Sequence, residues 1–252
     1  MKEMKTCWIV AGPNGAGKST LAKKYLPYNC ADYVNADNIA RERGLDGSTP
    51  NGFVAAGRVV HEKLNALIDG GRSFAIETTL SGRFYLGIIR RLRQKGWRVE
   101  LHYIYIPSRE FSAKRVEYRV LNGGHDVPEN DIRRRYARSV ANVREYSALC
   151  NYTACYDNSN ALPRFVFIKH EGSDPWVVDS DIYNIVMNGG RLGTAADKET
   201  QDRMALGKFE NAVIEELKQK SKDGQSVVIA DSEKQPIVRP ASEVLKEIPQ
   251  KR

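Results

Sequence analysis

The sequence predicts an α/β protein with a mainly parallel sheet, a large domain over residues 1–195 and a small appendage over 196–252. Two observations support this fold class. Short apolar runs that suit buried strands alternate with segments of helical periodicity. A glycine-rich loop also follows the first apolar run, Thr6–Ala11, and leads directly into a segment with helical character, 19–26. We therefore expect strand, glycine loop and helix in immediate succession.

The glycine-rich loop matches the P-loop pattern of glycine, four residues and Gly-Lys-Ser. Backbone N–H groups of such a loop close around phosphate oxygens, and the following helix dipole favours their charge. Lys18 is expected to reach the β and γ phosphates and to act in catalysis, while Ser19 ligates Mg²⁺. A purely structural turn is the alternative, which the flanking strand and helix disfavour. The predicted nucleotide-binding residues are Gly12, Pro13, Asn14, Gly15, Ala16, Gly17, Lys18, Ser19 and Thr20.

The overall composition is that of an ordinary globular chain, with 252 residues, 41% hydrophobic and 28% charged. No apolar run reaches the roughly 20 residues that span a bilayer, and the first strand begins almost at once. A cytoplasmic protein without membrane association is therefore expected. Its four cysteines and four histidines lack metal-site spacing, so no zinc site is predicted. The net charge of +8 suits an anionic ligand, or simply a basic surface.

The second predicted strand, 31–37, ends in a carboxylate. In parallel α/β sheets, ligands bind beyond the carboxyl ends of the strands. Asp37 is therefore expected near the γ phosphate, where it accepts a proton from an attacking hydroxyl or holds Mg²⁺ through water. The alternative is an N-cap of the next helix.

The third predicted strand, 74–79, also ends in polar residues, after a loop at 41–52 and a helix whose apolar positions begin at Phe53. Glu77 is expected to hold a substrate hydroxyl or to organise Mg²⁺ waters, and Thr78 to donate hydrogen bonds to the substrate. Arg83 is placed near the same cleft. Ser81 either contributes there or caps the next helix.

The fourth predicted strand, 98–106, ends in Pro107 and Ser108, where a motor ATPase would carry an acidic residue. This favours a small kinase. Two helices follow, at 108–121 and 129–149, joined by a segment with two glycines and a proline that predicts a hinged lid. Arginines on such a lid stabilise the charge that develops during phosphoryl transfer. Basic residues concentrate here: Arg109, Lys114, Arg115, Arg119, Arg133, Arg134, Arg135, Arg138 and Arg144.

Beyond the lid, strands are predicted at 154–158 and 164–168 and a helix at 179–187. The appendage is predicted to hold an amphipathic helix at 201–221, then strands at 226–230 and 236–239 before a basic tail. An apolar helix face needs a partner, and a lone hairpin is too small to be stable. These residues therefore pack on the large domain, on each other, or on a second chain. An inhibitory role is the alternative to a stabilising one.

Four segments together resemble the zeta-toxin family of P-loop kinases, within its branch of predicted ATPases: the P-loop, Val34–Asp37, Glu77–Thr79 and Gly123–Pro128. The resemblance covers roughly residues 5–190. It implies an adenylate-kinase-like parallel sheet flanked by helices, with a helical arginine-rich lid. It also implies that ATP or GTP with Mg²⁺ phosphorylates a sugar hydroxyl of a nucleotide sugar such as UDP-N-acetylglucosamine. An antitoxin-like protein partner that obstructs the nucleotide site is implied as well.

The same resemblance assigns roles to individual positions. The family's catalytic aspartate falls on Asp37, its substrate-binding glutamate on Glu77 and its first phosphate-contacting arginine on Arg119. The second such arginine falls near His125, where this sequence departs from the family and His125 becomes the substrate-binding candidate. Arg134 and Arg135 are the candidates to replace it.

Three functions remain open from the sequence. The first is a kinase for a small anionic acceptor, and the second is a kinase acting on polynucleotide ends or nucleosides. The third is a nucleotide-gated interaction protein without phosphotransfer. Nucleic acid ranks below small anions, because the sequence alone reveals no interleaved aromatic and basic stacking platform.

Overall fold

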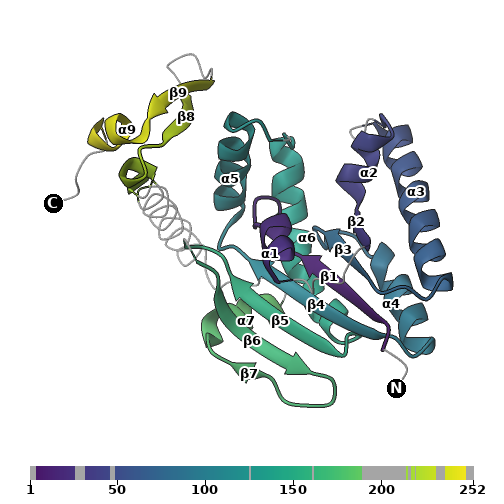
Figure 1. Ribbon diagram of the computed structural model, residues 1–252. Helices are drawn as coiled ribbons and strands as arrows, with labels where there is room; N and C mark the ends of the chain where they lie inside the picture. The colour runs from purple at the N-terminus through teal and green to yellow at the C-terminus, as the bar shows by residue number, and fades with distance from the viewer. Residues whose placement is uncertain are drawn as a thin grey trace.

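The computed structural model describes residues 4–25, 32–45, 49–124, 126–160, 162–188, 214, 217–218, 220–230 and 236–247. Its main element is a seven-stranded sheet in the order β2-β3-β1-β4-β5-β6-β7, flanked by helices on both faces (Figure 1). The strands are β1 (Thr6–Ala11), β2 (Asp32–Asn35), β3 (Phe74–Thr78), β4 (Arg98–Tyr105), β5 (Tyr152–Asp157), β6 (Arg164–His170) and β7 (Trp176–Val177).

The first five strands of this sheet pair in parallel, as the sequence predicts for an α/β fold. The last two, β6 and β7, are antiparallel, so the sheet is mixed at one edge rather than parallel throughout. Only short loops separate β5, β6 and β7, and such connections reverse the chain, whereas a parallel neighbour needs a long crossover.

Helices cover the two faces of the sheet unequally. On one face, residues of α3, α4, α6 and α7 share one buried cluster with Cys7, Ile9 and Ala11 of β1. On the other, α1 and the start of α5 pack against Val10 and the end of β4. The helices of the large domain are α1 (Lys18–Tyr25), α2 (Ala36–Glu42), α3 (Pro50–Asp69), α4 (Phe84–Gln94), α5 (Arg109–Leu121), α6 (Glu129–Ser147) and α7 (Ser180–Met187).

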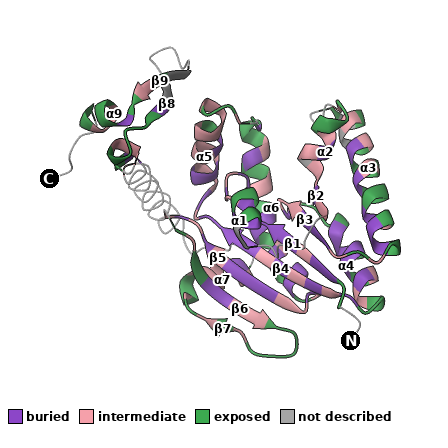
Figure 2. Cartoon of the chain, in the orientation of Figure 1, coloured by how far each residue is buried: buried purple, intermediate pink, exposed green. Residues whose placement is uncertain are grey.

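The core follows the sheet, whose central strands are buried along most of their length (Figure 2). Successive residues of β1 face opposite layers, and both layers are apolar, which is why this strand reads as a continuous hydrophobic run. Among the described residues, no helix is both long enough and apolar enough to cross a membrane.

Several helices and strands begin or end at residues other than those predicted. The second strand ends at Asn35 instead of residue 37, because the Asn35 side chain accepts a hydrogen bond from the N–H of Asn38 and begins α2 there. The predicted loop at 41–52 is shorter, since α2 runs to Glu42 and α3 begins at Pro50. Thr49 caps α3, accepting from the N–H of Gly52 at 3.1 Å.

The appendage contains the predicted hairpin, β8 (Ser226–Ala230) and β9 (Pro236–Pro240). The segment after the hairpin, for which the sequence gives only a basic tail, begins with α9 (Ala241–Glu247). Leu217, Val227 and Ala241 form a small buried cluster of their own. Most of the helix predicted at 201–221 lies outside the described residues, although 214, 217–218 and 220–222 are helical. β8 also approaches α5 of the large domain.

Candidate functional site

The P-loop joins β1 to α1 at the carboxyl edge of the sheet, as predicted. Its carbonyl oxygens are held by four different side chains. The amine of Lys18 donates to the carbonyl of Pro13 at 2.9 Å, and Ser112 of α5 donates to that of Asn14 at 2.6 Å. Arg115 of α5 donates to the carbonyl of Gly15 at 3.4 Å, and Asn158 after β5 donates to that of Ala16 at 2.8 Å.

Two glycines of the loop are required by its geometry. Gly12 has φ of +151°, and a Cβ there would lie 2.4 Å from the carbonyl oxygen of Ile104. Gly17 has φ of +89°, and a Cβ there would lie 2.6 Å from the side-chain nitrogen of Asn158. Both positions therefore combine a backbone conformation that L residues rarely adopt with close contact to a neighbouring element.

The hydroxyl of Ser19, the predicted Mg²⁺ ligand, donates to the carboxylate of Glu77 at 2.8 Å. The phenol of Tyr33 on β2 donates to the same carboxylate oxygen. Register explains the convergence, because Glu77 lies beside Asn35 of β2 on one side and Val10 of β1 on the other. The structure thus brings Glu77 beside the P-loop, where its carboxylate contacts Ser19 and Tyr33 rather than a separate acceptor pocket.

This pair of oxygen groups fits Mg²⁺ by its chemistry. Mg²⁺ prefers hard oxygen ligands and is bound through one or two protein groups together with waters and substrate phosphates. The hydroxyl of Ser19 is exposed and lies directly beside a carboxylate, so a cation that meets one meets the other. Among the described residues, no group of three or more His, Cys, Asp and Glu side chains forms an all-protein metal site.

Asp37 is the second residue of α2 and does not lie at the end of a strand. The alternative role, capping that helix, falls to Asn35 instead. The backbone at Asp37 still belongs to the carboxyl edge of the sheet, two residues beyond β2, which pairs with β3 next to the P-loop strand. Its assignment as the catalytic base stays a prediction.

The residues after β3 form a tight turn. The hydroxyl of Thr78 accepts a hydrogen bond from the N–H of Leu80, whose φ is +59°. The carbonyl of Thr78 accepts one from the N–H of Gly12. Ser81 exchanges a hydrogen bond with the hydroxyl of Thr79 at 2.9 Å, and no side chain caps α4. The expected helix cap at Ser81 is therefore wrong. Thr78 holds backbone here, and a substrate role for it stays a prediction.

Arg83 faces α6, where its guanidinium pairs with the carboxylate of Glu145 at 2.5 Å. The guanidinium side chain is 72% exposed, and the hydrogen bond to Glu145 raises its pKa further above the ordinary arginine value. The structure therefore uses Arg83 to join α4 to α6, and its expected place in the cleft is not what these contacts show.

The lid consists of the two predicted helices, α5 and α6. Glycine ends α5 as the sequence suggests: the N–H of Gly124 donates to the carbonyl of Arg119 at 2.9 Å, and that of Gly123, with φ of +78°, to Val120. This is the Schellman arrangement of helix ends. Arg119 lies directly under this turn, because a Cβ on Gly124 would meet its Cγ at 2.4 Å. His125 lies outside the described residues.

The arginines at the start of α6 are engaged within the lid. Arg134 and Arg135 both donate to Asp131 on their own helix, at 2.7 and 3.3 Å. Arg133 donates to Glu129 at 2.7 Å and lies 3.7 Å from Glu110 of α5. Neither Arg134 nor Arg135 is directed to the P-loop by these contacts, and their role as substitutes near His125 stays a prediction.

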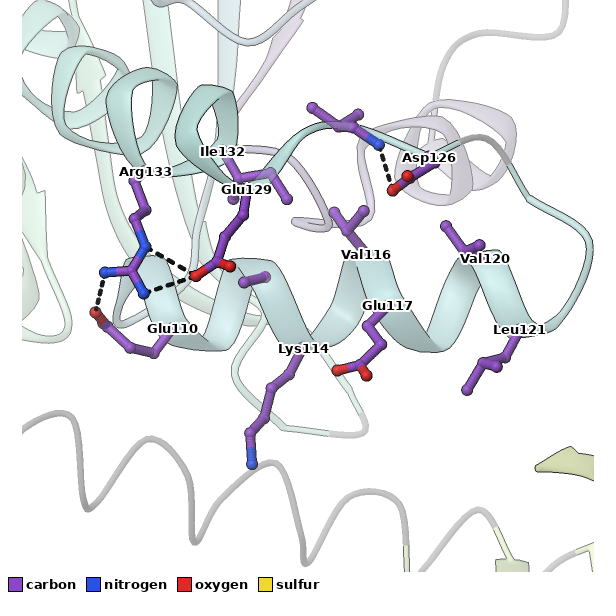
Figure 3. Close-up of a pocket in the computed structure, with 12 residues that line it drawn as sticks. Glu110, Lys114, Val116, Glu117, Val120, Leu121, Asp126, Glu129, Ile132 and Arg133 are labelled. Atoms are coloured by element: carbon purple, nitrogen blue, oxygen red, sulfur yellow. Dashed lines mark hydrogen bonds and ion pairs between the residues drawn. The ribbon is translucent and has the colours of Figure 1, made fainter. Parts of the chain in front are cut away.

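A cavity of about 520 Å³ lies between the lid helices and is distinct from the P-loop (Figure 3). Its apolar floor includes Val116, Val120 and Ile132, and its charged rim is mainly acidic. The rim residues are Glu110, Lys114, Glu117, Asp126, Glu129 and Arg133. An anionic acceptor is unsuited to a rim of this charge, so the P-loop edge remains the candidate reaction site.

Sequence reasoning missed Tyr33, Ser112 and Asn158 as parts of the site, and gave Arg115 only as one lid arginine among many. None of these residues belongs to a local motif, and their contacts reach across 44 to 142 residues of the chain. Strand order was the missing information, because it alone brings the ends of β2 and β5 and the start of α5 to the P-loop.

One family model and one relative match this chain. The family model described as zeta toxin matches residues 53–162. An uncharacterized protein of Haemophilus influenzae is 30% identical over 140 residues, which covers 52% of this chain and 98% of the relative. The chain belongs to the zeta toxin family. The matched range contains Glu77 and the lid, whereas the P-loop precedes it and is recognised by its own geometry.

Solved structures support the same fold for this zeta toxin family member. A crystal structure of AvrRxo1-ORF1:AvrRxo1-ORF2 with sulphate ions is 18% identical, with a TM-score of 0.57, covering 77% of this chain and 66% of the neighbour. A structure of the same complex with ATP is 17% identical, with a TM-score of 0.57, covering 82% and 77%. At this identity the likeness establishes an α/β P-loop kinase-like fold and nothing finer.

Proposed function

We propose that the protein is a kinase that transfers the γ phosphate of ATP or GTP, with Mg²⁺, to a hydroxyl of a small anionic acceptor. The observation that supports this most is the P-loop, whose carbonyls accept hydrogen bonds from Lys18, Ser112 and Asn158. The Ser19–Glu77 pair lies at its helix end. Membership of the zeta toxin family makes a nucleotide sugar, UDP-N-acetylglucosamine, the leading acceptor.

Each residue has a defined task in the proposed reaction. P-loop amides and Lys18 would hold the phosphates, and Ser19 and Glu77 would hold Mg²⁺, which would supply positive charge to offset that of the γ phosphate. Asp37 accepts the proton of the acceptor hydroxyl, whose oxygen bonds to the γ phosphorus. The bond from that phosphorus to the β–γ bridging oxygen breaks, and the nucleoside diphosphate leaves. Arg119 stabilises charge on the transferring oxygens.

Replacement of the proposed base tests this assignment. Asp37→Asn keeps the size of the side chain and removes its basicity, so transfer falls by about 10²–10⁴-fold while nucleotide affinity stays close to wild type. Phosphorus-31 NMR of protein with ATP, Mg²⁺ and a pool of nucleotide sugars reports the product as a new phosphomonoester signal. Asp69→Asn, at the exposed end of α3, is the matched control.

The same NMR experiment separates this proposal from its rivals. A phosphomonoester signal that Asp37→Asn abolishes supports the kinase. Inorganic phosphate without a phosphomonoester supports a nucleotide-gated interaction protein instead. Near-wild-type transfer by Asp37→Asn removes Asp37 as the base while leaving the kinase in place.

A single-stranded polynucleotide end is the second candidate acceptor, favoured by one structural observation. Rings of His170, Tyr152, His102, Tyr156 and Phe165 contact one another in series across β4, β5 and β6, with centroids 4.8 to 6.2 Å apart. Aromatic side chains on a sheet face are platforms for stacked bases. The sequence gives no local sign of this cluster, because its members come from three separate strands.

Binding of a labelled oligonucleotide tests this second candidate. Phe165→Ala removes a ring that is 46% exposed, and Phe84→Ala removes one that is 49% exposed on α4. Stacking on the cluster predicts weaker binding for the first variant alone, by about 5- to 100-fold per lost stack. Equal affinities of the two variants, or no binding by wild type at low salt, remove the polynucleotide acceptor.

The proposal includes an antitoxin-like protein partner that obstructs the nucleotide site. The solved ORF1:ORF2 complexes pair a chain of this fold with a second chain, which supports such a partner here. Co-purification of the intact protein with a product of a neighbouring gene, released by ATP, is the expected result.

A further inference from the structure

The loop that follows β5 reaches the P-loop through one side chain. We propose that Asn158 is a positioning residue that fixes the P-loop in its phosphate-binding shape, an inference that rests on the proposed function. Its side-chain amide donates to the carbonyl oxygen of Ala16 at 2.8 Å, across 142 residues of sequence. In the sheet, β5 pairs with β4 and β4 with β1, so this contact spans the strands that end at the P-loop.

The hydrogen bond determines the orientation of one peptide unit. In a trans peptide the C=O and N–H groups point in opposite directions. With the Ala16 oxygen held by Asn158, the N–H of Gly17 is directed to the other side of the loop. In a P-loop that N–H is among the groups that meet phosphate oxygens. Gly17 needs this support, because glycine at φ of +89° is free to adopt other conformations.

Asn158 is itself held on both sides. Its backbone N–H donates to the carbonyl of Tyr105 at the end of β4, at 3.0 Å. The preceding residue, Asp157, is fully buried and accepts from the N–H of Ser159 at 3.0 Å and from the guanidinium of Arg164 at 2.7 Å. The hydrogen bond with Asp157 raises the pKa of the Arg164 guanidinium above its ordinary value, so this guanidinium stays charged. The loop is therefore fixed before any ligand binds.

Position distinguishes Asn158 from the other two residues that hold the loop from outside. Ser112 and Arg115 both belong to α5, the first lid helix. Asn158 comes from the end of a central strand, which gives it a fixed place relative to β1 whatever the lid does. Asn158 therefore holds the P-loop from the sheet and not from the lid.

Two variants at this position separate a donor role from simple space filling. Asn158→Ala removes the donor, and a lost neutral hydrogen bond predicts about 3- to 10-fold weaker binding of ATP and of tripolyphosphate. Asn158→Asp keeps the shape but places a carboxylate against the Ala16 oxygen and near bound phosphates, so we expect a loss of about 30-fold or more. Titration calorimetry with each probe measures these affinities, and thermal unfolding reports stability.

Asn151→Ala is the matched control, because Asn151 immediately precedes β5 as Asn158 immediately follows it. The Asn151 side chain accepts from the N–H of Val99 at 2.8 Å at the opposite end of the same strand. This variant is expected to lose stability without losing affinity for ATP or tripolyphosphate. In turnover assays, Asn158→Ala raises the KM for ATP while kcat changes little.

These measurements distinguish a failure of the positioning role of Asn158 from a failure of the proposed kinase function. Wild-type affinity in both Asn158 variants overturns the positioning role and leaves the kinase assignment untouched. Equal losses in Asn158→Ala and Asn151→Ala overturn it too, since the effect is then general destabilisation. Wild-type protein that binds neither ATP nor tripolyphosphate overturns the proposed function, and this inference with it.

Discussion

The carboxylate of Glu77 accepts a hydrogen bond from the hydroxyl of Ser19, with 2.8 Å between Oε2 and Oγ. The two residues are 58 positions apart and meet because β3 lies beside β1 in the sheet. The relationship favours a role for Glu77 on the metal side of the proposed reaction, whereas the family resemblance implies a role at the acceptor.

Glu77→Gln distinguishes these two roles. The amide keeps the size of the side chain but removes the charge that attracts a cation, so a metal-side role predicts that more Mg²⁺ is needed for half-maximal turnover, by about tenfold. An acceptor role predicts instead a higher KM for the acceptor at saturating Mg²⁺. Magnesium titrations of turnover measure the difference. Glu171→Gln, an exposed carboxylate paired with Arg93, is the control.

Gly124→Ala is expected to impair the lid through Arg119. A methyl group at this position meets the Cγ of Arg119 at 2.4 Å and its carbonyl oxygen at 2.8 Å, so the arginine or the turn must move. If Arg119 stabilises the transferring phosphate, kcat falls by about 10-fold or more while nucleotide affinity is retained. Steady-state kinetics measure both quantities.

The control for that variant is Gly87→Ala, in the interior of α4. A Cβ there meets nothing within 4 Å. Alanine replaces glycine in a helix with a gain of about 0.5–1 kcal/mol, so this variant unfolds at slightly higher temperature with unchanged kinetics. Unchanged kcat in Gly124→Ala would contradict the role given to Arg119.

The buried thiols predict a pH-dependent reactivity pattern. Cys7, Cys150 and Cys155 are buried, and burial raises the pKa of the Cys150 thiol to about 12. Because the thiolate is the reactive form, these three residues should not react with Ellman's reagent in the native protein up to about pH 9. Unfolding in denaturant exposes all of them. Cys30 lies outside the described residues, so a Cys30→Ser variant supplies the background.

The raised pKa of the Cys150 thiol also makes the free energy of unfolding depend on pH. A thiol whose pKa is higher in the folded protein contributes stability that is complete below the unfolded value, near pH 8.5, and is lost as pH rises towards the folded value. Urea unfolding at pH 7.5 and pH 10 should therefore show lower stability at the higher pH. Cys150→Ala reduces that difference if Cys150 contributes to it.

The sequence predicts the parts of this site that are local. The P-loop is contiguous, and the glycine pair and the proline mark the lid helices within a few residues of their observed ends. The ion pairs of Arg134 and Arg135 could have been predicted from spacing alone, since Asp131 lies three and four positions before them. Such spacing predicts ion pairs within one helix rather than free lid arginines.

The parts that remained hidden depend on strand order. Tyr33 and Asn158 follow no motif. Tyr33 meets Glu77 and Asn158 meets the P-loop because the strand order brings β2 and β5 to the same sheet as β3 and β1. The position of Asp37 was mispredicted for a different reason. A single asparagine cap shifts the strand end by two residues and moves the aspartate into the first turn of a helix. Hydrophobic periodicity does not contain that information.

The last prediction concerns the appendage, residues 196–252. Its hairpin and α9 share a small cluster, and β8 approaches α5, the lid helix whose residues Ser112 and Arg115 hold the P-loop (Figure 1). Contact with that helix would restrain lid motion. Deletion of 196–252 is therefore expected to raise kcat by a few fold while residues 1–195 stay folded, with lid opening as a slow step.

Circular dichroism and steady-state kinetics of the truncated protein check this together. A folded truncated protein with unchanged kcat removes the inhibitory role and leaves α5 merely as a docking surface. Aggregation of the truncated protein instead assigns the appendage to stability. The point variant Val227→Ser then separates the two roles within the full chain, because it weakens the appendage's own cluster, in which Val227 is 4% exposed, without exposing the core of the large domain.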